Sequence, residues 1–156
     1  MEDSQIPANA HESKVPTAVT DFTGLYDIRP ATPEDTNFIL ATFLRGLYYG
    51  NDWYGLIPKA IFMANYKAVA EALVSGGKTS VMVACLKEDK DVILGYSILS
   101  ADFQTIHWVH VKSAWRKKGI ARSLVPKHPT AASHLSRLGI QLMSKFQGLI
   151  FNPFRL

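Results

Sequence analysis

The sequence contains one cysteine, no long apolar segment and no internal repeat, and each absence excludes a class of protein. A single thiol, Cys85, makes neither an internal disulfide nor a cysteine zinc cluster. The apolar runs fall well short of the roughly 20 residues that a membrane-spanning helix needs, and the polar first residues are unlike a signal peptide. We therefore expect a cytoplasmic protein with no membrane partner. The histidines lack the spacing of metal ligands, so we also expect no metal site.

Carboxylates are missing from the last third of the chain. Residues 103–156 contain nine of the 17 Lys and Arg and no Asp or Glu, whereas residues 1–102 contain all 13 carboxylates. This division indicates a negatively charged partner for the last third. Nucleic acid, an acidic membrane surface and a phosphate-bearing cofactor all fit such a charge.

The sequence does contain enough apolar side chain for one sizeable core. Of its 156 residues, 47% are hydrophobic and 19% are charged, which is typical of a globular domain. Residues 1–22 mix polar residues, carboxylates and prolines without any period, and we expect them to form a flexible tail. Residues 23–156 are expected to form a single domain.

The spacing of apolar residues predicts helices early in the chain and strands after them. Apolar residues three and four apart, with a proline near each start, predict helices over 33–47 and 58–75. Alternation and β-branched residues predict strands, and three consecutive antiparallel strands after two helices indicate an α+β meander. The predicted strands cover 25–30, 79–86, 92–100 and 105–112.

Beyond residue 112 the pattern is less regular. It predicts a short helix over 120–125, a strand over 130–135, a helix over 139–146 and a closing strand over 149–151. Residues 130–138 fit a helix equally well.

One turn between a predicted strand and a predicted helix combines glycine with positive charge. It reads Arg116-Lys-Lys-Gly119-Ile-Ala121. A turn that leads into a helix presents unpaired backbone N–H groups, and the helix dipole adds partial positive charge, so such a turn is able to hold a pyrophosphate. Gly119 and Ala121 keep bulky side chains away, while Lys117, Lys118 and Arg122 add positive charge.

The run from Val109 to Arg122 resembles the acetyl-CoA-binding motif of the GCN5-related N-acetyltransferase (GNAT) superfamily, Arg/Gln-x-x-Gly-x-Gly/Ala. The resemblance implies the α+β fold of the acyl-CoA N-acyltransferases, with a mixed, mostly antiparallel sheet flanked by helices. It also implies acetyl-CoA as cofactor and an amine as acceptor. The implied cofactor contacts are Val109 and Val111, through their backbone, and Arg116, Lys117, Lys118, Gly119, Ile120, Ala121 and Arg122.

The catalytic residues that are common in this superfamily are missing here. Its members commonly use a Glu as base and a Tyr as acid, but no carboxylate follows Asp102 and Met143 stands where the tyrosine is usual. Histidine is able to replace the base, because its pKa lies near neutrality. We take His107 as the candidate base, although an ordinary hydrogen-bonded histidine explains it as well.

Strict alternation of side chains along the predicted strand 105–112 would place His107 and His110 on opposite faces of the sheet. His110, His128 and His134 are weaker candidates for the base, because nothing in the sequence places them at the acetyl group.

The loop after the first predicted helix lies where similar enzymes vary with their acceptor. Tyr49, Asp52 and Trp53 are our candidates for contacts to the substrate, with the carboxylate and the rings suited to an ammonium. Packing of these aromatic residues within the core explains the same pattern.

The chain ends one strand earlier than is usual for the family. A partner, either a second copy or another protein, is expected to cover the edge of the sheet, or else the site is open to a larger substrate. Two further hypotheses compete with the enzyme: a catalytically inactive protein of this fold that acts through protein contacts, and a basic module that binds nucleic acid. We rank nucleic acid last, because the basic residues cluster around a motif that already explains them.

Overall fold

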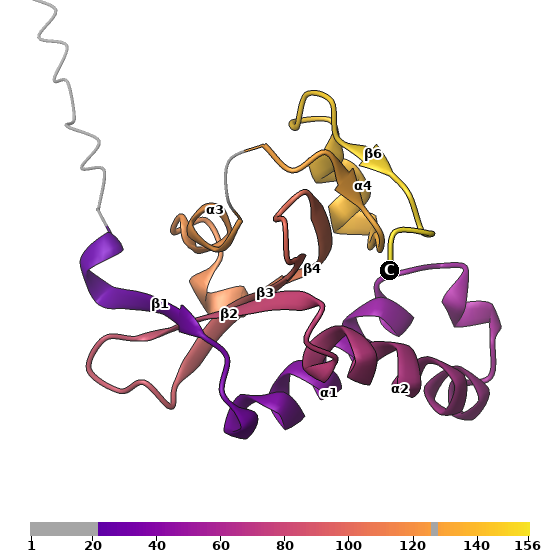
Figure 1. Cartoon of the computed structure of the whole chain (residues 1–156), viewed down its shortest axis with the longest axis horizontal. Coiled ribbons are helices and arrows are strands. Elements are labelled where there is room, and N and C mark those ends of the chain that lie inside the picture. Colours follow the sequence, from indigo (N-terminus) through magenta and orange to yellow (C-terminus); the bar gives the residue numbers. More distant parts are fainter. Residues whose placement is uncertain (1–21, 126–127) are drawn as a thin grey trace, which may run out of the picture.

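Residues 22–125 and 128–156 are described by the computed structural model in Figure 1. The predicted tail, residues 1–22, lies outside this part of the chain apart from Phe22. The strands are β1 Tyr26–Pro30, β2 Thr79–Leu86, β3 Ile93–Ser100, β4 Thr105–Val111, β5 Ala131–Ala132 and β6 Ile150–Phe151. The helices are α1 Thr36–Tyr49, α2 Lys59–Ser75, α3 Ile120–Leu124 and α4 Arg137–Met143.

The sheet follows the order of the chain. Six strands lie in the sequence β1-β2-β3-β4-β5-β6. The first four pair antiparallel, whereas β5 is parallel to both β4 and β6. The change from antiparallel to parallel pairing requires a connection that crosses the sheet, and the segment with α3 supplies it.

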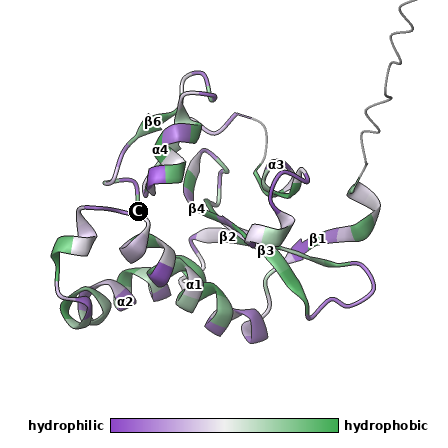
Figure 2. Cartoon of the chain, turned by 180° about the vertical axis from the view of Figure 1, so that it is seen from behind, coloured by the Kyte–Doolittle hydropathy of each residue, from purple (hydrophilic) through white to green (hydrophobic). Residues whose placement is uncertain are grey.

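The two faces of the sheet are covered by different helices (Figure 1). Helices α1 and α2 bury one face in a core that includes Phe43, Tyr96 and Trp108. The short α3 covers the other face with Ile120 and Leu124. Because helices cover both faces of β3, this strand is hydrophobic along most of its length, whereas the loop that joins it to β2 is hydrophilic (Figure 2). A strand covered on both sides has no solvent face to carry polar residues.

The start of the first helix is fixed by an ion pair. Pro33–Asp35 forms a 3₁₀ turn in which Thr32 and Asp35 make a reciprocal capping box. The nearly buried Asp35 carboxylate also accepts hydrogen bonds from Arg29 on β1, the shorter at 2.6 Å, and this contact lowers its pKa. The contact ties α1 to the edge of the sheet.

The last third of the chain differs most from its prediction. The predicted strand 130–135 shortens to Ala131–Ala132, and the helical alternative for 130–138 is wrong. Helix α4 begins at Arg137 rather than at residue 139, because Ser136 caps it by accepting a hydrogen bond from the amide of Gly139. The helix ends at Met143, three residues before its predicted end.

Within the described residues, no helix combines the length and the apolar character needed to cross a membrane.

Candidate functional site

Strands β4 and β5 pair over only two residues and then separate. The parallel register joins Thr105 to Ala131 and Ile106 to Ala132, and the Ser133 amide donates to the Ile106 carbonyl at 3.0 Å. From residue 107 onward β4 continues along β3 alone, while the chain after β5 turns away toward α4. One side of β4 is therefore left without a neighbouring strand among the described residues.

The backbone groups of Val109 and Val111 face this unpaired side. The amide of Lys112 donates to the carbonyl of Leu94 on β3 at 2.8 Å. In an antiparallel pair every second residue bonds to the neighbouring strand, so Val109 and Val111 direct their N–H and C=O groups away from β3. Arg116 Nε donates to the Val111 carbonyl at 3.1 Å. The two positions implied for the cofactor thus have the orientation that the role requires.

A β-bulge sits where the two strands part. The register of β3 with β4 steps from Ile98–Trp108 to Leu99–Ile106, so His107 is an extra residue on β4. A bulge of this kind interrupts the alternation of side chains. Both Trp108 and His107 consequently lie on the face that α1 and α2 cover.

This bulge corrects the expectation that His107 and His110 face opposite sides. Trp108 packs on Phe43 of α1 with ring centroids 5.3 Å apart, and His110 stacks on Tyr96 at 5.4 Å. His107 lines a cavity with Val69 of α2. The prediction was wrong because alternation holds only for a regular strand.

A row of hydrogen bonds leads from His107 into the core. His107 Nδ1 lies 2.7 Å from Ser133 Oγ, which lies 2.8 Å from His134 Nδ1, and His134 Nε2 lies 2.6 Å from the Tyr66 hydroxyl. His107, Ser133 and His134 are buried. We call these four residues the histidine row. It connects α2, β4 and the segment after β5.

Burial keeps both histidines of the row neutral near pH 7. Burial lowers the pKa of His107, and it lowers the pKa of His134 to about 4, with the nearby His107 acting in the same direction. Burial also raises the pKa of Tyr66, so its hydroxyl stays protonated. A neutral imidazole has one nitrogen that accepts a proton, as a general base must.

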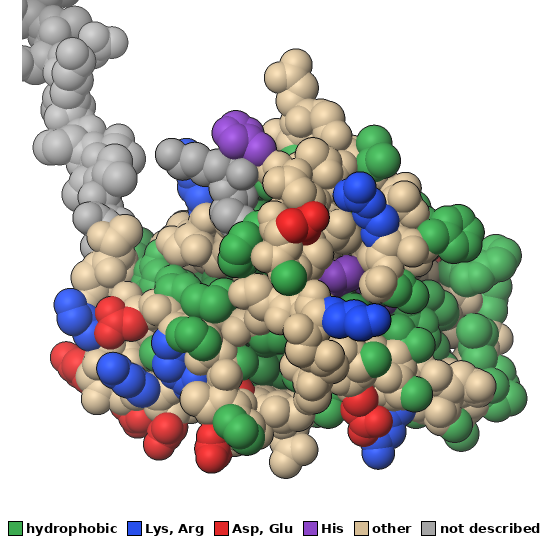
Figure 3. Space-filling view, in the orientation of Figure 1, with side chains coloured by type: hydrophobic (Ala, Val, Ile, Leu, Met, Phe, Trp, Pro, Cys, Tyr) green, Lys and Arg blue, Asp and Glu red, His purple; other side chains and the backbone are tan. Residues whose placement is uncertain are grey.

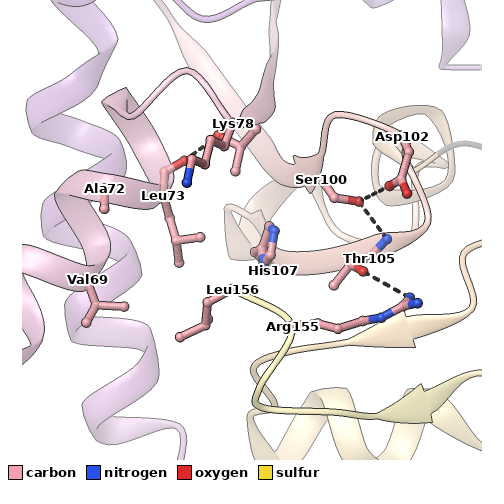
Figure 4. Close-up of a pocket in the computed structure, with 11 residues that line it drawn as sticks. Val69, Ala72, Leu73, Lys78, Ser100, Asp102, Thr105, His107, Arg155 and Leu156 are labelled. Atoms are coloured by element: carbon pink, nitrogen blue, oxygen red, sulfur yellow. Dashed lines mark hydrogen bonds between the residues drawn. The ribbon is translucent and has the colours of Figure 1, made fainter.

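His107 Nε2 is the atom of the row that faces outward. It has no hydrogen-bond partner among the described residues and is not one of their fully enclosed polar atoms. It faces a cavity of about 520 Å³ at the ends of β3 and β4 (Figure 4). Figure 3 shows a histidine near the centre of this face, with basic side chains above and below it and an acidic one beside it.

The turn after β4 has an unusual backbone. Lys117 and Gly119 both have positive φ, at 62° and 82°. A Cβ built on Gly119 would have only one neighbouring atom, the Tyr26 hydroxyl oxygen at 3.8 Å. The space on the side-chain side of Gly119 is therefore open. The N–H groups of 117–119 donate to no backbone carbonyl of the described chain, and those of Ile120, Ala121 and Arg122 form the unpaired first turn of α3.

The charges at this turn suit a phosphate-bearing group. Arg116, Lys117 and Arg122 are exposed. The Lys118 ammonium lies over the ring of Trp115 at 4.7 Å, and also over the ring of Phe22. The four cations and the free N–H groups form a donor set suited to the phosphates of coenzyme A.

The predicted acceptor residues lie apart from His107. Tyr49 lines a second cavity, of about 490 Å³, with His110 and residues of α1. Asp52 pairs with Arg137 of α4 at 3.0 Å, and Trp53 is exposed. None of the three lines the cavity before His107.

The remaining candidates are placed as follows. His128 is exposed in a turn with a φ of 72°, and Met143 is half-buried at the end of α4. His134 belongs to the histidine row together with Ser133 and Tyr66. The sequence alone did not indicate that these side chains meet. The described residues hold no group of three or more His, Cys, Asp or Glu that suits a metal ion.

Comparisons with known proteins bear on the fold. No family model and no curated protein matches the sequence. Among solved structures, apo YjaB from Escherichia coli is 20% identical with a TM-score of 0.46, covering 65% of this chain and 62% of its own. A GCN5-related N-acetyltransferase from Rhodopseudomonas palustris, also described as a class II aminotransferase, is 20% identical with a TM-score of 0.45, covering 65% and 61%.

A third structure matches more of the chain. A proposed acetyl transferase from Pyrococcus furiosus is 16% identical with a TM-score of 0.52, and the match covers 81% of each chain. The match to the first two structures, by contrast, spans about three fifths of their length. The predicted fold class is confirmed: a six-stranded mixed sheet flanked by helices, which is the fold of the GCN5-related N-acetyltransferases.

Proposed function

We propose that this protein is an acetyl-CoA-dependent N-acetyltransferase that transfers an acetyl group to an amine of a small molecule or a protein. The observation that carries the proposal is the turn from Arg116 to Arg122, where open space at Gly119 meets free N–H groups and cations. It lies at the end of β4, whose backbone is unpaired on the same side. The proposal includes a cytoplasmic location, which the single cysteine favours.

The turn and β4 would hold the cofactor. The N–H groups of Gly119, Ile120 and Ala121 would bind the pyrophosphate, and Val109 would pair its backbone with the pantetheine arm. When bound, acetyl-CoA supplies an acetyl group that its thioester activates toward an amine.

His107 would act as the base. An amine attacks only when it is neutral, so a group at the site must take its proton. His107 Nε2 faces the cavity, and its Nδ1 is held by Ser133 at 2.7 Å, which fixes the orientation of the ring. No carboxylate or tyrosine hydroxyl is needed for this single role.

Isothermal titration with acetyl-CoA and with CoA tests the cofactor site. Gly119→Glu places a carboxylate and a side chain in the space for the pyrophosphate, and we expect micromolar binding by the natural protein to be lost in this variant. Gly148→Glu is the matched control, because Gly148 also has a positive φ, of 83°, and open surroundings, but lies before β6. A substitution there carries the same backbone strain without blocking the turn.

Binding that survives in Gly119→Glu, or is lost equally in both variants, would contradict the proposed site. Absence of binding by the natural protein would favour the second candidate, an inactive protein of this fold that acts through protein contacts. The missing carboxylate and tyrosine support that candidate. A nucleic-acid module, ranked third, would instead bind unrelated DNA in a way that free CoA does not displace.

A further inference from the structure

A second cavity lies between α1 and β4. Thr42, Arg45, Gly46 and Tyr49 line it from one face of α1, and His110 lines it from β4. We call it the α1 cavity. No residue lines both the α1 cavity and the larger cavity described above. Its volume of about 490 Å³ is within the range of small-ligand pockets, roughly 300–1,000 Å³.

The imidazole of His110 is held by ring contacts and not by hydrogen bonds. It stacks on Tyr96 of β3 and meets the ring of Phe38 edge-on, with ring centroids 5.4 and 6.3 Å apart. Neither nitrogen of His110 has a hydrogen-bond partner among the described residues, and neither is fully enclosed. Both nitrogens are therefore available to a ligand.

Positive charge surrounds the α1 cavity. Arg45 is exposed and forms neither an ion pair nor a hydrogen bond with a described residue. Burial lowers the pKa of His110, and the charges of Arg116 and Lys112 act in the same direction. The ammonium of Lys59 lies 5.3 Å from the ring centre of another lining residue.

No carboxylate of the described chain offsets these charges at the cavity. No Asp or Glu lines it, and α1 itself contains none. Asp35, just before α1, is bound by Arg29, and Asp52, just after it, is paired with Arg137. The α1 cavity therefore favours a negatively charged ligand.

The donors of the α1 cavity suit a carboxylate better than a phosphate. The planar guanidinium of Arg45 matches the two oxygens of a carboxylate, and one imidazole N–H of His110 supports them. Phosphate sites commonly use free backbone N–H groups, whereas the middle of α1 uses its N–H groups within the helix. The ring of Tyr49 is 54% exposed and offers a surface for a flat apolar body.

We propose that the α1 cavity binds the carboxylate of a small molecule with a flat apolar body, of which benzoate is the simplest. Arg45 binds the carboxylate, and the ring of Tyr49 packs on the apolar body. His110 donates a hydrogen bond to the carboxylate and gains a proton on binding, because a nearby negative charge favours the protonated imidazole. The site is separate from the turn at Gly119 and does not rest on the proposed function.

Benzoate and its uncharged analogue benzamide test the proposal without any cofactor. NMR follows the ring signal of His110 from pH 5 to pH 8, and the signal that is missing in His110→Gln identifies it. We expect benzoate to raise the pKa of His110 and to bind about tenfold more tightly at pH 5 than at pH 8, since protonation and binding favour each other equally. Benzamide has the same shape without the charge and is expected to have neither effect.

Variants locate the site. Arg45→Gln removes the guanidinium, and we expect the affinity for benzoate to fall about tenfold. Lys67→Gln is the matched control, because it removes one positive charge from an exposed position on α2 outside the cavity. Gly119→Glu blocks the proposed cofactor turn, and the affinity for benzoate is expected to stay within about twofold in this variant.

The outcomes separate this proposal from the proposed function. An unchanged pKa of His110 in benzoate, or equal binding of benzoate and benzamide, overturns the proposal. An equal effect of inorganic phosphate overturns the choice of a carboxylate. Loss of benzoate binding in Gly119→Glu would place the ligand at the cofactor turn and overturn the α1 cavity as its site. Failure of acetyl-CoA to bind would contradict only the proposed function.

Discussion

One inserted residue decides where the candidate base points. Without the bulge, His107 would follow the alternation of β4 and face away from α1 and α2, far from Ser133 and Val69. With the bulge, the imidazole bonds to Ser133 and faces the cavity. The sequence suggests histidine as a replacement for the missing carboxylate, but a bulge depends on the neighbouring strand and leaves no mark in β4 alone.

Replacement of His107 by glutamine tests its role as a base. The variant keeps a polar side chain but accepts no proton, so we expect kcat to fall on the order of 100-fold or more while acetyl-CoA affinity is retained. Steady-state kinetics and titration measure the two quantities. His128→Gln, at an exposed turn, is the control. An unchanged kcat in His107→Gln would show that another group takes the proton.

Burial of His134 makes stability depend on pH. In the folded protein its pKa is lowered to about 4 from a usual value of 6.5. Above pH 6.5 both states are neutral, whereas between 6.5 and 4 only the unfolded chain binds the proton. The free energy of unfolding is thus expected to fall by about 3 kcal/mol over this range.

Urea unfolding at pH 7.5, 5.0 and 4.0 measures this effect, with His134→Gln as the comparison. The glutamine has no proton to gain, so we expect the difference in stability between pH 7.5 and 4.0 to be smaller in the variant. An equal loss of stability in both proteins would mean that His134 is protonated in the folded state.

Helix α1 packs against β4 through a glycine. A Cβ built on Gly46 would lie 2.9 Å from Cζ2 of the nearly buried Trp108. The indole is enclosed by the core and has little room to move, because interiors are close-packed. The helix therefore lies nearer to the sheet here than any residue with a side chain allows.

Alanine at this position is expected to destabilise the fold. Helix propensity alone favours Gly→Ala by about 1 kcal/mol, but the contact with Trp108 should reverse the sign and lower the free energy of unfolding by about 1–3 kcal/mol. Gly139→Ala is the control, because the same Cβ on α4 has only ordinary contacts, at 3.4 Å and beyond. Thermal or urea unfolding decides the matter, and a stabilised Gly46→Ala would show that α1 is free to shift.

Regular elements with a clear period were predictable, and the connections that depend on distant contacts were not. β2 matches its predicted range, and α2 begins one residue after its own. β5 is shorter than its pattern, because Ser133 and His134 turn to meet His107 and Tyr66. The turn at Gly119 is a local motif and was visible in the sequence, whereas the cavity joins residues from 69 to 156, which no local pattern brings together.

At the scale of the whole molecule, β6 is the last strand of the sheet among the described residues and pairs with β5 alone. Ile150 and Asn152 donate their amides to the segment around β5, so the amide and carbonyl of Phe151 face outward. The side chains of Ile150 and Phe151 are also exposed. An edge strand with free backbone groups and apolar side chains is suited to pairing with another chain.

A homodimer through β6 is one of the two partners we proposed for this edge. Phe151→Pro removes the outward N–H and keeps both bonds to β5, so analytical ultracentrifugation should show a dimer that this substitution weakens. Phe154→Ala, which removes an exposed ring beyond the strand, should leave it intact. A natural protein that stays monomeric would exclude the homodimer and leave either a different protein as the partner or a site open to a larger substrate.

The histidine row has a consequence for the direction of its own hydrogen bonds. The Ser133 hydroxyl has one hydrogen, so it donates to one histidine and must accept from the other. The row is therefore polarised in one of two senses. In the first, His107 Nδ1 donates to Ser133, and the Tyr66 hydroxyl at the far end accepts from His134. In the second, Ser133 donates to His107, and the Tyr66 hydroxyl donates to His134. A base at His107 Nε2 requires the first sense, because the single hydrogen of the neutral ring then lies on Nδ1. The direction of the hydrogen bond at the Tyr66 hydroxyl therefore reports which nitrogen of His107, at the other end of the row, is free to accept a proton.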